Sequence, residues 1–426
     1  MKCLTLKPLS YCLTRNGLTG LALFVSLLLS SAAFAWGERG HHLIGHEAAR
    51  LIKDIESTTQ KKKGLGYFFN DRCIQIGHLS NIPDTSWKIF SRKKVKESNF
   101  STHFIDPEVV LGLPDSEKEI LNYTNKIKRL PNDYKEAFKK FNGKQSHLPE
   151  SKEQKVQFYK DVGTGPWHSQ FLYDQLVKAL RCGKNKKTSK KEVYASDIQL
   201  PLIDKESPVN PTYICKEDRP PEDDFHAAVA LAGVLSHFIA DLAQPLHTTA
   251  NYDGWHSGHG KIHVYFESLV LQLLGEDLNA EVAKLIRDKK FQDKIWKEVG
   301  LPLKRRNSIA QLSLNLTAQS YQLIDEVEKL DNTYAIIVKG KPLPWSKARS
   351  KEKNSYAPKR KPADDATVLK AFRPLIVKRL AVGSFLLAKI WMQAWNDSGK
   401  PDLSKFNAVS FPYLFNVPYI WPDYAQ

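Results

Sequence analysis

Apolar residues recur along most of this chain at intervals of three and four, whereas strict apolar–polar alternation is scarce. The first pattern is typical of amphipathic helices, and the second would indicate strands. The segment 223–244 is the clearest example, because an acidic start leads into a run of Ala, Leu and Val that Pro245 ends. The pattern predicts helices over about residues 41–56, 117–142, 151–182, 223–244, 264–274, 277–298, 307–331 and 365–396. No repeat is visible. Because helical periodicity dominates the chain, we expect an all-α fold.

Two long stretches between these helices, 183–222 and 332–364, are rich in Pro and Lys and predict basic loops. Residues 401–426 contain seven aromatic residues and four prolines, which favours an irregular, packed extension over a helix. The expected organisation is therefore a single multi-helix domain over 36–400 and an irregular aromatic tail over 401–426.

The first 35 residues have the composition of a secretory signal peptide. Three basic residues precede an apolar run from Leu21 to Leu29, and Ala33-Phe34-Ala35 provides an A-x-A cleavage site. Cleavage between Ala35 and Trp36 would deliver a secreted or periplasmic protein. Since no other apolar segment approaches the length of a membrane span, we expect the mature protein to be soluble.

The chain is basic, with a net charge of +17. The predicted signal holds three of the basic residues and no acidic one, so the mature charge is about +14. Such a surplus favours nucleic acid or anionic lipid surfaces as partners, and it equally fits a secreted protein with lysine-rich loops. No obligate protein partner is evident. Beyond the signal, Cys73, Cys182 and Cys215 allow one disulfide, most simply Cys182 with Cys215, and leave one thiol.

Histidines and acidic residues gather in the stretch 236–270, which holds five of the thirteen histidines. His237 and Asp241 are four apart on a predicted apolar helix, so both side chains lie on one face. His247 follows the Pro245 break, and His263 and Glu267 are again four apart. A single such pair would fit an ordinary hydrogen-bonded pair, but two pairs joined by a histidine favour a zinc site of nitrogen and oxygen donors.

Two other segments carry related chemistry. The sequence WGERGHHLIGHEAARL contains His46-Glu47, but it lacks the second histidine of a zincin motif, so we reject that interpretation. The sequence DTSWKIFSRKKVKESNFSTHFIDPE supplies Asp84, His103 and Asp106 around an aromatic cluster.

These segments together resemble the bacterial zinc-dependent phospholipases C, which share an all-α trinuclear zinc fold with the secreted single-strand-specific nucleases. The matching pieces cover about a quarter of the chain in the same order. They are Trp36, STHFIDPE, SHFIADLAQPLHTTAN, HVYFESLV and the closing helix KRLAVGSFLLAKIW.

The resemblance implies three zinc ions and assigns their ligands. One ion would be held by Asp84, His103, His237 and Asp241. A second would be held by His247, His263 and Glu267, with His259 or, less favoured, His256 as a competitor for His263. A third would be held by the amine and carbonyl of Trp36, by His41 and by a shared Asp241.

The same resemblance leaves two branches open. His41 follows Trp36 by five residues, as in the nucleases, whereas the phospholipases place this histidine further along. The second set ends in H-x3-E, as in the phospholipases, whereas the nucleases end it with Asp in an N-L-H-x-x-W-D-like segment. Glu267 therefore favours a phospholipase C acting on a phospholipid or membrane surface, with a zinc-dependent single-strand-specific nuclease or nucleotidase as the alternative.

Both branches cleave a phosphodiester at a phosphorus–oxygen bond, and the resemblance implies that Asp84 orients or deprotonates the attacking water. Phe100 matches an aromatic residue of the phospholipase choline pocket. The other partners of that pocket have no counterpart, since Arg39 and Thr85 stand at the nearest positions. We therefore expect Phe100 and Arg39 to contact substrate, with Arg39 suited to anionic head groups. There is also a non-enzymatic alternative. It is a secreted protein that binds polyanions or membranes and contains a structural zinc cluster.

Overall fold

The computed structural model describes most of the chain from Trp36 onward. The described residues are 36–56, 64–88, 93–111, 120–141, 162–185, 215, 217, 221–300, 308–343, 351–404 and 420. The predicted signal peptide, nearly all of the aromatic tail and most of the loop 183–222 lie outside these residues and stay predictions.

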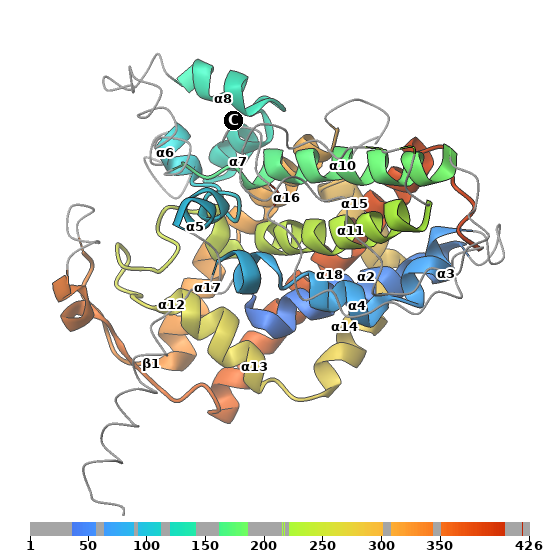
Figure 1. Ribbon diagram of the computed structural model, residues 1–426. Helices are drawn as coiled ribbons and strands as arrows, with labels where there is room; N and C mark the ends of the chain where they lie inside the picture. The colour runs from blue at the N-terminus through green and yellow to red at the C-terminus, as the bar shows by residue number, and fades with distance from the viewer. Residues whose placement is uncertain are drawn as a thin grey trace, which may run out of the picture. The chain divides into compact units, whose positions relative to one another are not determined.

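Helices dominate the described residues, which confirms the all-α prediction (Figure 1). The longer helices are α2 (Gly37–Glu56), α10 (Gly165–Asn185), α11 (Pro221–Ala243), α14 (Asp277–Arg287), α15 (Lys289–Glu298), α16 (Ser308–Tyr321) and α18 (Ala366–Asp397). Shorter helices are α3 (Leu65–Asn70), α4 (Cys73–Leu79), α5 (Lys93–Phe100), α6 (Pro107–Leu111), α7 (Ile120–Lys128), α8 (Tyr134–Phe141), α12 (Ile262–Val264), α13 (Leu271–Leu273) and α17 (Ile324–Leu330). Single turns are the π-helical η1 (Pro83–Trp87), η5 (Tyr265–Val270) and η6 (Asp331–Ala335), and the 3₁₀ helices η4 (Pro245–Thr248) and η8 (Lys351–Tyr356).

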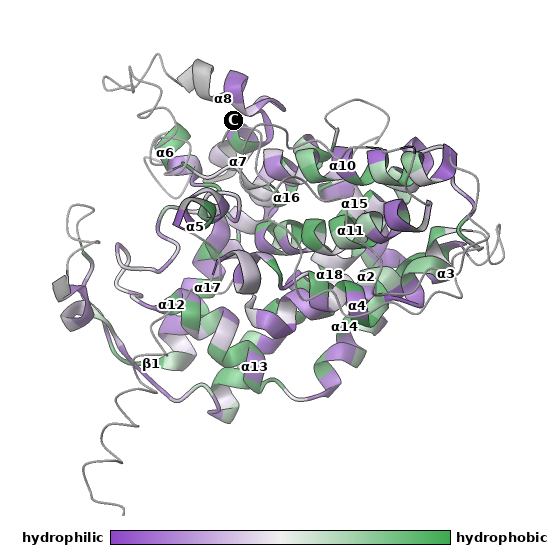
Figure 2. Cartoon of the chain, viewed as in Figure 1, coloured by the Kyte–Doolittle hydropathy of each residue, from purple (hydrophilic) through white to green (hydrophobic). Residues whose placement is uncertain are grey.

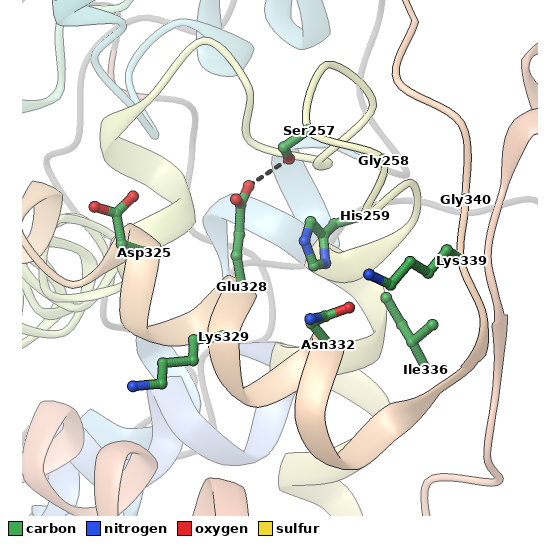
Figure 3. A pocket seen from close by; sticks show the side chains of 10 residues that line it. All are labelled: Ser257, Gly258, His259, Asp325, Glu328, Lys329, Asn332, Ile336, Lys339 and Gly340. Atoms are coloured by element: carbon green, nitrogen blue, oxygen red, sulfur yellow. Dashed lines mark hydrogen bonds between the residues drawn. The ribbon is translucent and has the colours of Figure 1, made fainter. Parts of the chain in front are cut away.

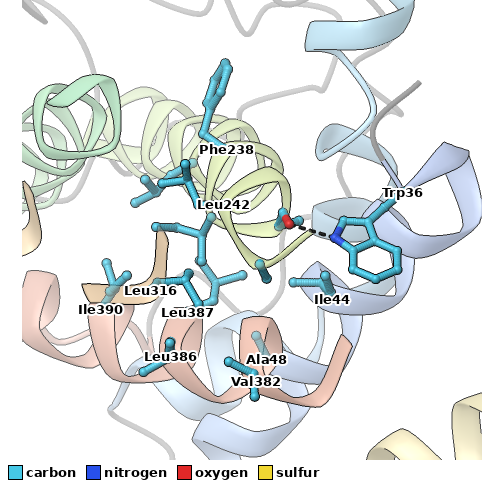
Figure 4. Close-up of a cluster of buried hydrophobic side chains, with 14 of the residues drawn as sticks. Trp36, Ile44, Ala48, Phe238, Leu242, Leu316, Val382, Leu386, Leu387 and Ile390 are labelled. Carbon is cyan, nitrogen blue, oxygen red and sulfur yellow. Dashed lines mark hydrogen bonds between the residues drawn. The ribbon is translucent and has the colours of Figure 1, made fainter. Parts of the chain in front are cut away.

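The helix α11 lies at the centre of the core. It packs against α10, with which it runs side by side, and against α16, α18 and α2 (Figure 1). Leu242 of α11 lies among aliphatic side chains of α16 and α18, such as Leu316 and Leu387 (Figure 4). By length and composition α11 is apolar enough to cross a membrane, contrary to our expectation for any segment beyond the signal. Its apolar stretch is entirely buried within the fold, so a core helix accounts for this composition.

Most helices carry apolar residues on one side and hydrophilic residues on the other (Figure 2). The predicted helices over 223–244 and 365–396 are close to the observed α11 and α18. Several others prove to be two helices. Arg129–Asp133 separates α7 from α8, because Pro131 cannot continue a helix. Asp288 ends α14 and caps α15 by accepting the amides of Lys290 and Phe291 at 2.7 and 3.2 Å.

The stretch 332–364, predicted as a loop, contains η6, η8 and a short antiparallel strand pair. The strands are β1 (Ile336–Val338) and β2 (Lys359–Arg360). The predicted Cys182–Cys215 disulfide is confirmed, with the two Cα atoms 5.7 Å apart, and Cys73 lies outside any disulfide.

Candidate metal centre

The C-terminal half of α11 places two functional groups in the core. His237 and Asp241 lie one turn apart and are fully buried. His237 donates from Nδ1 to the carbonyl oxygen of Ser80 at 2.7 Å, which leaves Nε2 facing Asp241 Oδ2 at 3.3 Å. That backbone bond fixes the imidazole in the tautomer whose Nε2 lone pair is available to a metal.

His103 and Asp84 complete the first predicted set. His103 Nδ1 lies 2.9 Å from His237 Nε2, 3.0 Å from Asp241 Oδ2 and 3.9 Å from Asp84 Oδ1. Metal–ligand bonds of about 2.0–2.1 Å in a tetrahedron separate the ligand atoms by roughly 3.3 Å. His103, His237 and Asp241 therefore converge at a spacing that suits one ion, whereas Asp84 groups with His237 and His41.

The second predicted set also converges. Glu267 Oε2 lies 3.0 Å from His263 Nε2 and 3.6 Å from His247 Nε2. His247 donates from Nδ1 to the carbonyl of His103 at 2.9 Å, so its Nε2 is turned toward Glu267. Gln244, in the Q-P-L-H turn, donates to Glu267 Oε2 at 2.7 Å and holds that carboxylate in place.

The structure distinguishes His263 from its competitors. His259 Nδ1 lies 2.8 Å from Asp331 Oδ2, and His256 Nδ1 lies 2.7 Å from the carbonyl of Leu343.

His259 lines an open pocket of about 480 Å³ at η6 and β1 (Figure 3). The side chains that line the pocket include Ser257, Asp325, Glu328, Asn332 and Lys339.

The third predicted set is only partly reproduced. His41 Nε2 lies 3.3 Å from Asp241 Oδ1, and its ring stacks on that of His237 with centroids 3.9 Å apart. Trp36 is fully buried, and its indole donates to the carbonyl of Ala240 at 2.7 Å (Figure 4). Its backbone nitrogen, however, donates to Glu267 Oε2 at 3.1 Å, and its carbonyl accepts the Gly40 amide at 3.1 Å. Trp36 thus reaches the cluster, but through Glu267 of the second set.

The two predicted carboxylate ligands outside α11, Asp84 and Glu267, lie on π-helical turns. Asp84 is in η1 and Glu267 is in η5, and the wider turn displaces each side chain from the position that a regular helix would give it. Such turns are frequent at functional sites.

Several atoms of these side chains have no hydrogen bond of acceptable geometry although they are buried. They are both ring nitrogens of His41 and of His263, His103 Nε2, His247 Nε2, Asp84 Oδ2, Asp241 Oδ1 and Glu267 Oε1. Buried polar atoms normally have hydrogen-bond partners. The large number of buried polar atoms without one at this site therefore indicates a missing partner. Within the described residues, three overlapping groups could hold a metal ion: His41, Asp84 and His237; His103, His237 and Asp241; and His247, His263 and Glu267.

The electrostatics of the cluster agree with a cationic partner. Burial, reinforced by neighbouring imidazoles, holds the pKa of His41 and His103 well below the usual range, and burial does the same for His237. These imidazoles are therefore neutral and can act as ligands. Burial, together with the carboxylates of Asp84 and Glu267, raises the pKa of Asp241 well above its usual value. A bound cation would offset that cost.

The pKa of Glu267 is shifted in the opposite direction from that of Asp241. Burial raises its pKa, but His263 and His247 outweigh burial and hold the pKa of this carboxyl below its usual value. Conversely, burial lowers the pKa of His263, but Glu267 raises it above the usual value. Without a cation, the two side chains form a buried ion pair.

Two supporting residues were missed by the sequence interpretation. Lys88 Nζ lies 3.1 Å from Asp84 Oδ1, and its side chain is 23% exposed. The i,i+4 spacing of Asp84 and Lys88 was a usable signal. Glu108, which closes the STHFIDPE segment, accepts from Thr249 Oγ1 at 2.6 Å and from the Ala250 amide at 3.0 Å. It holds the loop that follows His247.

The two predicted substrate contacts, Phe100 and Arg39, lie in different surroundings. Phe100 ends α5 and is 53% exposed, with its ring against Phe104 at 5.2 Å between centroids. The exposed Tyr252, which the sequence interpretation missed, lies edge-on to His263 at 5.5 Å. The Arg39 guanidinium donates to backbone carbonyls at the end of α13, and its contact with substrate stays a prediction. The acceptors are Leu271 at 3.1 Å, Gln272 at 3.2 Å, Gly275 at 2.8 Å and Leu274.

Comparison with family models, with curated proteins and with solved structures gives no match for this chain.

Proposed function

We propose that this protein is a zinc-dependent phosphodiesterase that holds three zinc ions, and that it acts as a phospholipase C on glycerophospholipids. The proposal rests on the buried convergence of His41, Asp84, His103, His237, Asp241, His247, His263 and Glu267, many of whose nitrogen and oxygen atoms lack a hydrogen-bond partner. Zinc is the cation suited to imidazole and carboxylate donors at this spacing. The resemblance noted from the sequence supports the number of ions and the reaction.

When bound, zinc supplies Lewis acidity for the phosphoryl group and lowers the pKa of water toward 7. The residues of the chain provide the rest. Asp84, with one oxygen at Lys88 and the other without a hydrogen bond, would orient the attacking water. Lys88 would bind a non-bridging phosphate oxygen and offset the charge that develops there. In-line attack would expel diacylglycerol and release the phosphorylated head group.

The exposed aromatic side chains of Phe100 and Tyr252 are candidates for substrate contact. Phe100 precedes His103 by three residues, and the Tyr252 ring lies 5.5 Å from that of His263. With Arg39 engaged at the end of α13, the basic surface is the remaining feature that favours anionic head groups. Glu267 in the H-x3-E form is the feature that favours lipid over nucleic acid.

A head-group panel tests the proposal. Vesicles containing phosphatidylcholine, phosphatidylglycerol or phosphatidylinositol would be incubated with the protein before and after chelation and after zinc return. We expect diacylglycerol release that is lost with the chelator and restored by zinc. The His247→Asn variant is the negative control, and the His256→Gln variant is the matched control. Metal binding without turnover of any lipid would contradict the lipid assignment.

One observation favours a second candidate, a zinc-dependent single-strand-specific nuclease. His41, at the W-x4-H spacing typical of the nucleases, lies 3.3 Å from Asp241 and so belongs to the cluster. The net charge of +17 also suits a nucleic-acid substrate. Chelator-sensitive cleavage of single-stranded DNA, with no diacylglycerol released in the vesicle assay, would decide for the nuclease.

A further inference from the structure

A second group of nitrogen and sulfur donors lies where α2 meets α4, apart from the cluster described above. It joins two sequence features that the proposed function does not use: the His46-Glu47 pair and Cys73. His42 and His46 are four residues apart on α2, and Cys73 and His78 lie on α4. None of the four side chains is buried, and His78 is exposed.

These side chains are already in contact. The rings of His42 and His78 meet edge-on with centroids 4.8 Å apart, and those of His42 and His46 stack at 5.8 Å. Interaction with the Cys73 thiol, followed by that with Glu47, raises the pKa of the His46 imidazole to about 9. Its Nδ1 also lies 3.0 Å from Glu47 Oε1. A carboxylate behind an imidazole is the partner that a ligating histidine usually has.

Gly77 lets the two helices approach closely enough for this contact. A Cβ on Gly77 would lie 2.7 Å from His42 Nδ1 and 2.9 Å from the His42 carbonyl oxygen. The His42 ring therefore occupies space that any other residue at position 77 would fill. The ligand atoms are farther apart than those of the three buried groups, so side-chain rotation would be needed to bring them around one ion, and the donors are partly exposed.

We propose that His42, His46, Cys73 and His78 form a further zinc site that joins α2 to α4 through three imidazoles and one thiolate. Two histidines four apart on a helix present donors to one ion, and zinc accepts mixed nitrogen and sulfur ligands. Binding would displace the thiol proton of Cys73 and the additional proton that His46 carries near neutral pH. Both protons pass to solvent, and each imidazole then contributes one lone pair.

The site would brace the supports of the buried cluster. Helix α2 carries His41, and α4 is followed by Ser80, whose carbonyl holds His237, and then by Asp84. A zinc ion between α2 and α4 would fix these elements relative to each other without contacting substrate. The site stands independently of the proposed enzymatic function.

Cobalt provides a specific test, because the buried cluster has only nitrogen and oxygen donors. The full-length protein would be stripped of metal and titrated with Co²⁺, and its near-ultraviolet spectrum recorded. We expect a sulfur-to-cobalt charge-transfer band in the wild type and in the His256→Gln control, and no band in Cys73→Ser. Zinc content should be one ion per chain lower in Cys73→Ser than in the wild type, by elemental analysis.

His78→Gln provides a second variant at an exposed position, where folding is not at stake. Competition with a chromophoric chelator should show one zinc ion bound at least about tenfold more weakly than in the wild type, with the others unchanged. The absence of a charge-transfer band in the cobalt-loaded wild type, or equal zinc content in the wild type and Cys73→Ser, overturns the proposal. Either result leaves the proposed phosphodiesterase activity untouched.

Discussion

At the scale of single residues, Lys88 is the clearest addition to the site. It is a partly exposed cation held 3.1 Å from the carboxylate of Asp84. If it binds a phosphate oxygen, Lys88→Met should lower kcat by about 10²-fold, the usual effect of losing one charge-stabilising donor. Lys88→Arg, which keeps the charge, should retain most of the activity, and zinc content should be unchanged in both. Loss of zinc from Lys88→Met would show instead that Lys88 only holds Asp84.

Asp241 is the residue most widely shared within the cluster. It faces His41 at 3.3 Å, His103 at 3.0 Å and His237 at 3.3 Å. Because it belongs to two of the proposed zinc sets, Asp241→Asn should lower the zinc content by about two ions per chain relative to the wild type.

The matched control is Glu267→Gln. The Glu267 carboxylate is a proposed ligand only in the set with His247 and His263, so this variant should lower the zinc content by about one ion per chain. Elemental analysis of both purified variants distinguishes them. Equal losses in the two variants would contradict the division into separate sets.

The ligand pairs four residues apart were predictable because helical periodicity alone places their side chains on one face. His263 could not be chosen over His259 from spacing, since the left-handed backbone at Lys261 and the hydrogen bond of His259 with Asp331 decide between them. The surroundings of Arg39 could not be predicted for a similar reason: its four carbonyl acceptors come from a helix end more than 230 positions away in sequence.

At the scale of elements, Arg39 connects α2 to the end of α13. Charge-assisted hydrogen bonds to backbone carbonyls contribute about 1.5–3 kcal/mol in favourable cases, and partial exposure reduces this. We expect Arg39→Met to lower the free energy of unfolding by about 1–2 kcal/mol in denaturant titration. KM for every head group should stay unchanged. A selective rise in KM for anionic lipids would instead support the predicted contact of Arg39 with anionic head groups.

The pattern of apolar residues predicted the type of the long elements well, because burial of one face determines it. It did not predict where they break, since a single residue such as Pro131 or Asp288 decides this locally. The π-helical turns at Asp84 and Glu267 leave no periodic signal in so few residues. The strand pair in 332–364 depends on long-range contacts, among them the ion pair of Arg360 with Asp331 at 2.7 Å.

At the scale of the whole molecule, buried histidines outside the cluster should make the fold sensitive to acid. Burial lowers the pKa of His168 to about 3, and its ring packs against Phe238 and Phe171. A folded-state pKa below the unfolded value of about 6.5 means that the unfolded chain takes up the proton first as pH falls. Stability from this residue is therefore present above pH 6.5 and is lost toward pH 3.

The His168→Phe variant, with no group to protonate, should be less acid-sensitive. Between pH 7 and 4.5 the wild type should lose about 2–3 kcal/mol more unfolding free energy than this variant. Parallel denaturant titrations of the wild type and the variant at both pH values measure the difference. An identical pH dependence in both would show that His168 is protonated in the fold without cost.

Processing of the N-terminus should affect the entire centre, because Trp36 joins α2 to the cluster. Its indole bond to Ala240 and full burial fix the residue whether or not a peptide precedes it. Its nitrogen, 3.1 Å from Glu267 Oε2, can only donate while it belongs to a peptide bond, whereas a free neutral amine can also bind zinc. A chain beginning at Trp36 should therefore bind one more zinc ion, and be more active, than a chain with one added glycine before Trp36. A glycine added after Gln426 controls for the extra residue, and equal zinc content and activity in all three chains would rule out a role for the free amine.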